Sequence, residues 1–128
     1  MHNQHIHSVT IIGAGTMGNG IAHVCAMAGF PVKLMDSSEE QLRFALQTIE
    51  KNLTRMAEKQ KIKPIEVGSS LARIQTYTDI KQAISDADMV LEVVPEQLTL
   101  KKQIWSQIEQ GIDPKRLKQT IFATNTSS

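Results

Sequence analysis

Three glycines near the start of the chain have the spacing of a phosphate-binding turn. Gly13, Gly15 and Gly18 form a GxGxxG string that follows an apolar run and opens a segment with helical periodicity. The first glycine permits a tight turn, the second lets the main chain approach a pyrophosphate, and the third lets the helix pack closely on a sheet. Thr16 and Met17 complete the string, and amides at such a helix N-terminus bind phosphates. A glycine-rich turn that holds no ligand is the alternative.

An acidic residue lies eighteen positions after the last of these glycines. Asp36 directly follows the expected strand 32–35, where a carboxylate can accept hydrogen bonds from the adenosine ribose of a bound dinucleotide. This carboxylate would repel the 2′-phosphate of NADP, and Ser37 and Ser38 offer no cation to hold that phosphate. The pattern therefore predicts NAD as the cofactor, with NADH bound much more tightly than NADPH. Asp36 could instead cap a helix or close a turn, and the two roles can coexist.

Short apolar runs alternate with segments of helical periodicity along the chain. The expected strands cover 9–12, 32–35, 73–76, 89–94 and 120–124, and the expected helices cover 16–28, 39–61, 79–85 and 98–110. Pro64 and Gly68 mark a break, in which 65–71 could hold one more helical turn. The alternation predicts an α/β fold, a Rossmann-type doubly wound parallel sheet that is truncated after the fifth strand and has a long helical excursion after strand two. Residues 1–128 are then one NAD-binding domain that lacks its sixth strand.

Two of the expected helices carry clear apolar faces. In the first, which Gly29 ends, the face expected to pack inward consists of Met17, Ile21, Val24, Cys25 and Ala28. In the second, Ser37 or Ser38 is expected to cap the N-terminus. Its inward residues, at steps of four and three, are Leu42, Leu46, Ile49, Leu53 and Met56. On this pattern Cys25 is a small core residue rather than a nucleophile.

The composition excludes several classes of protein. Of the 128 residues 41% are hydrophobic and 21% are charged, as in an ordinary globular domain, and the net charge of +1 gives no reason to expect nucleic-acid binding. No apolar run approaches the roughly 20 residues that span a bilayer, and the N-terminus lacks the features of a secretory signal. We therefore expect a cytoplasmic protein. His2, His5 and His7 have no neighbouring Cys, Asp or Glu to complete a metal site, so no metal is expected.

Three blocks of the sequence carry a family resemblance. They are GAGTMGNGIA at 13–22, EVVPEQLTLK at 92–101 and NTSS at 125–128. In this order the blocks resemble the N-terminal domain of the L-3-hydroxyacyl-CoA dehydrogenases over nearly the whole chain. The related β-hydroxyacid dehydrogenases share the glycine string but not the other two blocks. Val93 and Gln97 depart from the family pattern, which usually has Ala and Asn or Asp there, but neither position supplies a charged group.

The resemblance assigns roles at the carboxyl ends of the central strands, where open α/β sheets bind ligands. It implies that Glu96 and Lys101 lie at the nicotinamide ribose side of the cofactor and that Asn125 lies near the nicotinamide. It also implies that Ser127 hydrogen-bonds the 3-oxygen of the substrate and orients the carbon that exchanges hydride. Simpler roles stay open: Glu96 could favour a helix N-terminus, Lys101 could be a solvated lysine, and Ser127 could belong to a turn.

The long second helix carries a row of cations. Lys51, Arg55 and Lys59 are four residues apart and so lie along one face, and the basic stretch continues to Lys63. Such a row could screen the phosphate charges of a coenzyme A nucleotide. The resemblance implies that this helix holds coenzyme A through Asn52 and Lys59. A solvated basic face is the alternative.

The activity implied by the resemblance is the reversible, NAD-dependent conversion of 3-hydroxyacyl-CoA to 3-ketoacyl-CoA in fatty acid metabolism. This oxidation needs a general base, which the family places on a histidine of the sixth strand, paired with a glutamate, beyond Ser128. The family's helical C-terminal domain, which forms its homodimer, also lies beyond this point. The chain is therefore expected to bind NADH without turning over acetoacetyl-CoA. Two alternatives stay open: a dehydrogenase of a non-CoA hydroxy acid, of gulonate or carnitine type, and a nucleotide-sensing module without chemistry.

Overall fold

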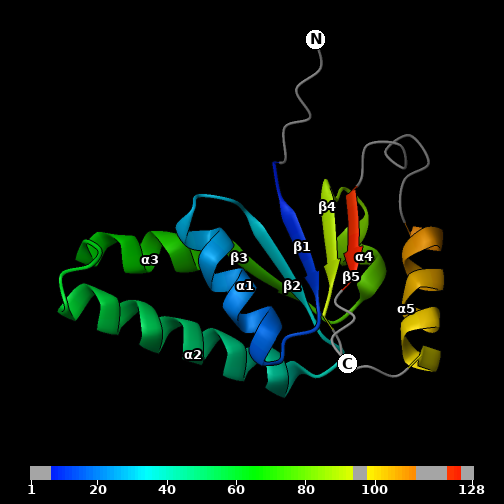
Figure 1. Ribbon diagram of the computed structural model, residues 1–128, viewed down its shortest axis with the longest axis horizontal. Coiled ribbons are helices and arrows are strands. Elements are labelled where there is room, and N and C mark those ends of the chain that lie inside the picture. Colours follow the sequence, from blue (N-terminus) through cyan, green and yellow to red (C-terminus); the bar gives the residue numbers. More distant parts are fainter. Residues whose placement is uncertain (1–6, 94–97, 112–120, 125–128) are drawn as a thin grey trace, which may run out of the picture.

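The computed structural model describes residues 7–93, 98–111 and 121–124. Strands and helices alternate through these ranges, as the sequence predicts (Figure 1). In chain order the elements are β1 (Val9–Ile12), α1 (Thr16–Met27), β2 (Val32–Met35), α2 (Glu39–Glu58), α3 (Pro64–Ala72), β3 (Ile74–Tyr77), α4 (Ile80–Ile84), β4 (Met89–Glu92), α5 (Leu98–Gly111) and β5 (Ile121–Thr124).

The strands of the described part form one parallel sheet in the order β3-β2-β1-β4-β5. β1 is central, and its Ile11 is in register with Leu34 of β2 and Leu91 of β4. The chain starts in the middle, builds outward to β3 and then crosses to β4 on the other side of β1, which is the winding of a Rossmann-type sheet. The predicted fold is confirmed, including the long helical excursion, because both α2 and α3 lie between β2 and β3 in the chain.

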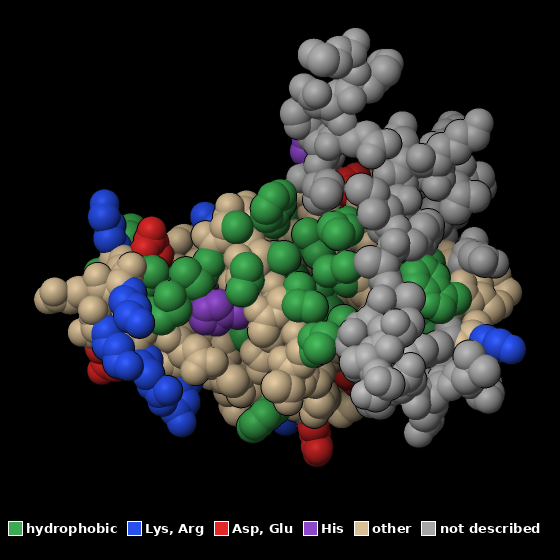
Figure 2. Space-filling view, in the orientation of Figure 1, with side chains coloured by type: hydrophobic (Ala, Val, Ile, Leu, Met, Phe, Trp, Pro, Cys, Tyr) green, Lys and Arg blue, Asp and Glu red, His purple; other side chains and the backbone are tan. Residues whose placement is uncertain are grey.

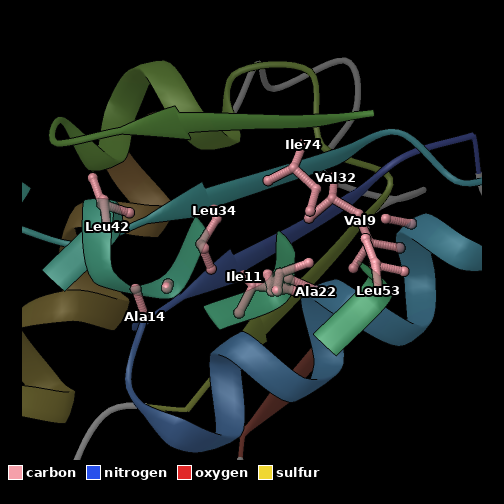
Figure 3. Packing of buried hydrophobic residues seen from close by; sticks show 12 residues of the cluster. Val9, Ile11, Ala14, Ala22, Val32, Leu34, Leu42, Leu53 and Ile74 are labelled. Atoms are coloured by element: carbon pink, nitrogen blue, oxygen red, sulfur yellow. The ribbon is translucent and has the colours of Figure 1, made fainter. Parts of the chain in front are cut away.

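Helices cover both faces of the sheet. Because side chains alternate along a strand, β1 directs Val9 and Ile11 into the cluster beneath α1, α2 and α3, and Ile12 into the cluster beneath α4 and α5. Figure 3 shows the first cluster, to which β2 contributes Leu34 and α2 contributes Leu53. All four residues of β1 are buried, and the hydroxyl of Thr10, the one polar side chain among them, donates a hydrogen bond of 3.0 Å to the carbonyl oxygen of Ala83.

The rotation of α1 about its axis differs from the prediction. Gly18, Ala22 and Ala26 face the sheet and are buried, whereas Met17 is 46% exposed and Val24 is 65% exposed. The predicted inward face is therefore wrong for Met17, Val24 and Ala28, which are exposed, whereas Ile21 and Cys25 are half-buried and pack against the core cluster. A helix that lies this close to the glycine turn has room only for small residues on its contact face, so the contact at Gly18 fixes the rotation.

The apolar face of α2 agrees with the prediction. Leu42, Ile49 and Leu53 are buried, and Leu46 and Met56 are half-buried. α2 and α3 lie against each other at the edge of the molecule beyond β3 (Figure 1). Together they form the outer part of the layer that covers α1's side of the sheet.

The ends of α2 and α3 differ from the prediction. α2 ends at Glu58 rather than near Lys61, because Gln60 has a φ of +59°, a left-handed conformation that cannot continue a right-handed helix. α3 is longer than the single turn expected, and Pro64 starts it at the first helical position, where a proline is well tolerated. Gly68 lies inside this helix and marks no break.

α5 packs on the opposite face of the sheet. Ile108 is buried, Ile104 is half-buried, and Trp105 packs half-buried against the same cluster. The helix ends at Gly111, one residue later than predicted. β4 ends at Glu92, two residues earlier than predicted. In the described part of the chain, none of the helices combines the length and the apolar character needed to cross a membrane.

Candidate functional site

The turn between β1 and α1 has the conformation that its glycines predict. Gly13 has a φ of +111°, which residues with a side chain rarely adopt. Its N–H donates a hydrogen bond of 2.7 Å to the carbonyl oxygen of Met35. The turn is thereby tied to the end of the neighbouring strand β2, at the edge of the sheet where all the strands end.

Gly18 brings α1 against the same turn. A Cβ atom on Gly18 would lie 1.8 Å from the carbonyl oxygen of Gly13 and 3.3 Å from Cγ2 of Val93. No side chain fits there, so the predicted role of Gly18 in close packing is confirmed. A Cβ atom on Gly15 would lie 3.7 Å from Nε2 of Gln41, which is an ordinary contact. The approach of a pyrophosphate to Gly15 therefore stays a prediction.

The first turn of α1 contains no acidic residue. Gly15 is the N-cap residue, has an extended backbone and, as a glycine, supplies no capping side chain. Thr16 is exposed and Met17 is nearly half exposed. A helix end of this kind has amides and a positive partial charge that suit a phosphate.

Asp36 contacts both the glycine turn and the start of α2. Its Oδ2 accepts a hydrogen bond of 2.9 Å from the Ala14 N–H, and its Oδ1 accepts one of 2.9 Å from the Ser38 N–H. Ser38 is the N-cap of α2, and its hydroxyl accepts from the Gln41 N–H at 3.1 Å. The turn role that the sequence left open for Asp36 is therefore present. The residue is only half-buried, so it stays accessible to a ligand as well.

A cavity of about 200 Å³ opens beside Asp36. Its apolar walls come from four elements: Ile12 of β1, Met35 of β2, Ile80 of α4 and Ile104 of α5. Gly13 of the glycine turn also lines the cavity. Sequence reasoning missed this feature, because its walls are brought together only by the winding of the sheet.

Polar groups line the rest of the same cavity. Asp36 and Ser37 lie on one side, and Gln103 and Gln107 of α5 lie on another. Neither glutamine was predicted as a site residue. The only sequence signal is their spacing of four, which places both on one face of α5, but glutamines at this spacing are common on helix surfaces.

Four predicted site residues cannot be placed. Glu96, Asn125 and Ser127 lie outside the described residues, and Lys101 belongs to α5 without a described side chain. The predictions that concern them stay predictions.

The strand ends that lead to these residues meet beside the glycine turn. Glu92, the last residue of β4, is in register with Ile12 of β1 and with Thr124 of β5. Glu92 is fully buried, a position that sequence reasoning did not single out. Segments that continue from β4 and β5 therefore start at the same edge of the sheet as the turn and Asp36.

The predicted row of cations is a surface feature of α2. Lys51, Arg55 and Lys59 are all exposed, and Figure 2 shows Lys and Arg side chains gathered along this helix. Lys59 is the C-cap residue, and its N–H donates to the Arg55 carbonyl. Asn52 lies beside the row and is half-buried. A contact of Asn52 or Lys59 with coenzyme A stays a prediction.

Two titratable side chains of α1 have pKa values that their surroundings shift. Burial lowers the pKa of His23 and raises the pKa of Cys25. A thiol with a raised pKa is a weak nucleophile at neutral pH, which agrees with a packing role for Cys25, although the residue lies at the edge of the core rather than inside it. Within the described ranges, no three His, Cys, Asp or Glu side chains are grouped closely enough to hold a metal ion.

The fold and the site together define a class of protein. A parallel sheet in this strand order, a glycine turn at the first strand and a carboxylate at the end of the second are the parts of a dinucleotide-binding Rossmann domain. Residues 8–128 match the family of the 3-hydroxyacyl-CoA dehydrogenase NAD binding domain, and the chain belongs to this family. NAD is accordingly its cofactor.

Individual relatives agree with the family. A probable 3-hydroxyacyl-CoA dehydrogenase of Caenorhabditis elegans is 39% identical over 98% of this chain and 42% of its own length. The mitochondrial hydroxyacyl-coenzyme A dehydrogenase of Rattus norvegicus is 38% identical over 96% of this chain and 40% of its own length. The crystal structure of (S)-3-hydroxybutyryl-CoA dehydrogenase from Ralstonia eutropha superposes with a TM-score of 0.88 at 36% identity, over 97% of this chain and 42% of that one. The chain thus spans about two fifths of the length of these relatives.

Proposed function

We propose that residues 1–128 are the cofactor-binding domain of an NAD-dependent L-3-hydroxyacyl-CoA dehydrogenase, which interconverts 3-hydroxyacyl-CoA and 3-ketoacyl-CoA. The observation that carries the proposal is the pair of hydrogen bonds that holds the Asp36 carboxylate between the glycine turn and α2. A carboxylate at this place can accept hydrogen bonds from ribose hydroxyls. The names of the worm and rat relatives support the substrate class.

The carboxyl ends of the strands would hold the cofactor. Gly13 and Gly18 shape the turn, and the amides of Gly15, Thr16 and Met17 would bind the pyrophosphate at the start of α1. The carboxylate of Asp36 would bind the adenosine ribose, and the cavity beside it would take the adenine.

The second half of the site would be formed by residues that follow β4 and β5. Glu96 and Lys101 would bind at the nicotinamide ribose, and Asn125 would lie near the nicotinamide. Ser127 would hydrogen-bond the 3-oxygen of the substrate and hold the reacting carbon toward the cofactor. The bound nicotinamide supplies the hydride acceptor for the oxidation.

Titration of the chain with NADH and NADPH tests the cofactor site. NADH is expected to bind much more tightly, because the Asp36 carboxylate would repel the 2′-phosphate. Asp36→Ala is expected to weaken NADH binding about tenfold and to narrow the difference between the two dinucleotides. Asp88→Ala is the matched control, because this carboxylate also accepts from two main-chain amides, those of His7 and Ser8, at the opposite edge of the sheet.

Two results would overturn the cofactor assignment. Equal affinities of the unaltered chain for NADH and NADPH would remove Asp36 from the ribose role. No detectable heat when NADH is added to the folded chain would reject the site as a whole.

The row of cations on α2 supports a site for the coenzyme A part of the substrate. Lys59→Glu is expected to raise the apparent dissociation constant for acetoacetyl-CoA several-fold and to leave that for NADH unchanged. Lys102→Glu makes the same charge change at an exposed position of α5, on the other face of the sheet, and is expected to change neither constant. An unchanged constant for acetoacetyl-CoA in the Lys59 variant would reject the proposed contact between this row of cations and coenzyme A.

The proposal assigns the general base to a histidine outside residues 1–128. The chain on its own is therefore expected to bind NADH and not to oxidise it with acetoacetyl-CoA. His23 is the chain's one histidine outside the stretch before β1, and burial on α1 lowers its pKa. Turnover by the purified chain would contradict the assignment.

For the whole protein we propose a homodimer in the cytoplasm, which sedimentation and cell fractionation would test.

A further inference from the structure

Two glutamines are placed so that they could recognise the base of the bound dinucleotide. Gln103 and Gln107 lie one helical turn apart on α5, and both line the cavity beside Asp36. Ile104 lies between them in the chain and forms part of the apolar wall, and Ile108, the residue after Gln107, is fully buried in the core. The isoleucines anchor the helix on the core, and Gln103 and Gln107, which are exposed to solvent, line the cavity from the same helix.

The size of the cavity restricts what it can hold. Sites for whole drug-sized ligands measure about 300–1,000 Å³. A volume of about 200 Å³ is smaller and suits one planar ring system rather than a complete nucleotide. Asp36 lines the cavity and is half-exposed, so a ribose bound to its carboxylate could remain outside while the base attached to that ribose enters.

The chemistry of the lining selects among bases. An apolar slot formed by Ile12, Met35 and Ile80 would accept any flat ring. A glutamine amide presents one acceptor oxygen and a donor nitrogen, and this pair matches the N6 amino group of adenine together with its neighbouring ring nitrogen. A site built to hydrogen-bond a group discriminates strongly against an analogue that lacks it.

We infer that Gln103 and Gln107 hydrogen-bond the N6 amino group of adenine and make this site selective for the adenine dinucleotide. The inference rests on the proposed NAD site and adds a residue-level source of base specificity to it. The glycine turn and Asp36 would fix the phosphates and the ribose, whereas the two amides would identify the base.

The test compares NAD with 1,N6-etheno-NAD, in which a two-carbon bridge removes both N6 hydrogens of adenine. The unaltered chain is expected to bind NAD about tenfold more tightly than the etheno analogue, measured by calorimetry. In the double variant Gln103→Leu and Gln107→Leu, NAD should bind more weakly and the etheno analogue at least as well, so that the ratio of the two constants approaches one. Gln110→Leu is the matched control, because this glutamine is exposed on the same helix and does not line the cavity.

The outcomes separate this inference from the cofactor assignment. Equal affinity of the unaltered chain for NAD and the etheno analogue would overturn the proposed recognition of N6. A double variant in which both dissociation constants rise by the same factor would also overturn it. No binding of either dinucleotide would overturn the NAD site itself. If the double variant fails to fold, as judged by circular dichroism, Gln103→Leu and Gln107→Leu are measured singly against the same ratio.

Discussion

At the scale of single residues, Asp36 and the glycine turn hold each other in place. The Gly13 N–H is bonded to Met35, the residue before Asp36, and the Asp36 carboxylate is bonded to Ala14, the residue after Gly13. The spacing of the sequence predicts which residues meet, because a glycine string and an acid at the end of the next strand recur together. It does not predict that the carboxylate bonds to the turn, since that bond depends on how β1 and β2 lie side by side.

Two glycines of α1 provide a test at this scale. Gly18→Ala is expected to destabilise the chain by about 3 kcal/mol and to abolish NADH binding, because the added Cβ would lie 1.8 Å from a main-chain oxygen that cannot move without breaking the turn. Gly20→Ala is the control on the same helix. Apart from the adjoining backbone of the helix itself, no atom of the described residues would lie within 4 Å of its Cβ, so the substitution is expected to stabilise the helix by about 0.5–1 kcal/mol.

Thermal unfolding and NADH titration of both variants would measure these effects on stability and cofactor binding. A Gly18→Ala variant with unchanged stability and unchanged NADH binding would show that the turn can yield, and that the close contact does not control the site.

At the scale of elements, α1 shows where the apolar pattern and the packing disagree. The widest apolar stripe of the helix includes Met17 and Val24, and this stripe is turned roughly a third of a turn away from the sheet. Hydrophobicity alone favours burial of the larger side chains. The glycine turn overrides this preference, because only small residues such as Ala22 and Ala26 can follow Gly18 along the contact line. Periodicity therefore identifies the helix but not its rotation.

The start of α2 offers a test of one element. Ser38→Ala is expected to lower the free energy of unfolding by about 1 kcal/mol, because the Ser38 hydroxyl accepts from the Gln41 N–H and caps the helix. Ser37→Ala is the matched control, since Ser37 is exposed and is not the cap. Chemical denaturation of both variants would measure their free energies of unfolding, and only Ser38→Ala is expected to lower it. Equal losses would mean that the hydroxyl of Ser38 does not act as the cap.

At the scale of the whole molecule, the sequence predicts the sheet but not the cavity that the sheet creates. Alternating strands and helices, a first strand followed by a glycine turn and a long helical excursion are local patterns, and each was recognisable in the chain. The cavity beside Asp36 joins Met35 to Ile80 and to Ile104, which are far apart in sequence. Their meeting depends on the crossover from β3 back to β4, so a local pattern cannot reveal it.

The acid stability of the whole domain depends partly on His23. Burial lowers the pKa of this residue below its ordinary value of 6.5, so the unfolded chain takes up the proton at a higher pH than the folded chain. The contribution of His23 to stability is therefore complete above pH 6.5 and is lost as the pH falls through the folded pKa. The free energy of unfolding is expected to fall more steeply below pH 6.5 in the unaltered chain than in His23→Gln. Parallel pH curves from denaturant titrations would contradict this.

The two hydrogen bonds of the Asp36 carboxylate have a consequence for redesigning the cofactor site to bind NADP. The two carboxylate oxygens accept hydrogen bonds from the Ala14 and Ser38 amides. A small neutral residue at position 36 would make room for the 2′-phosphate of NADP, but it would also remove both bonds, which hold the glycine turn to the start of α2. A single exchange at this position should therefore yield a poorer binder of the original coenzyme rather than a good binder of the new one. A successful redesign would need a second substitution that supplies new hydrogen-bond acceptors for the Ala14 and Ser38 amides.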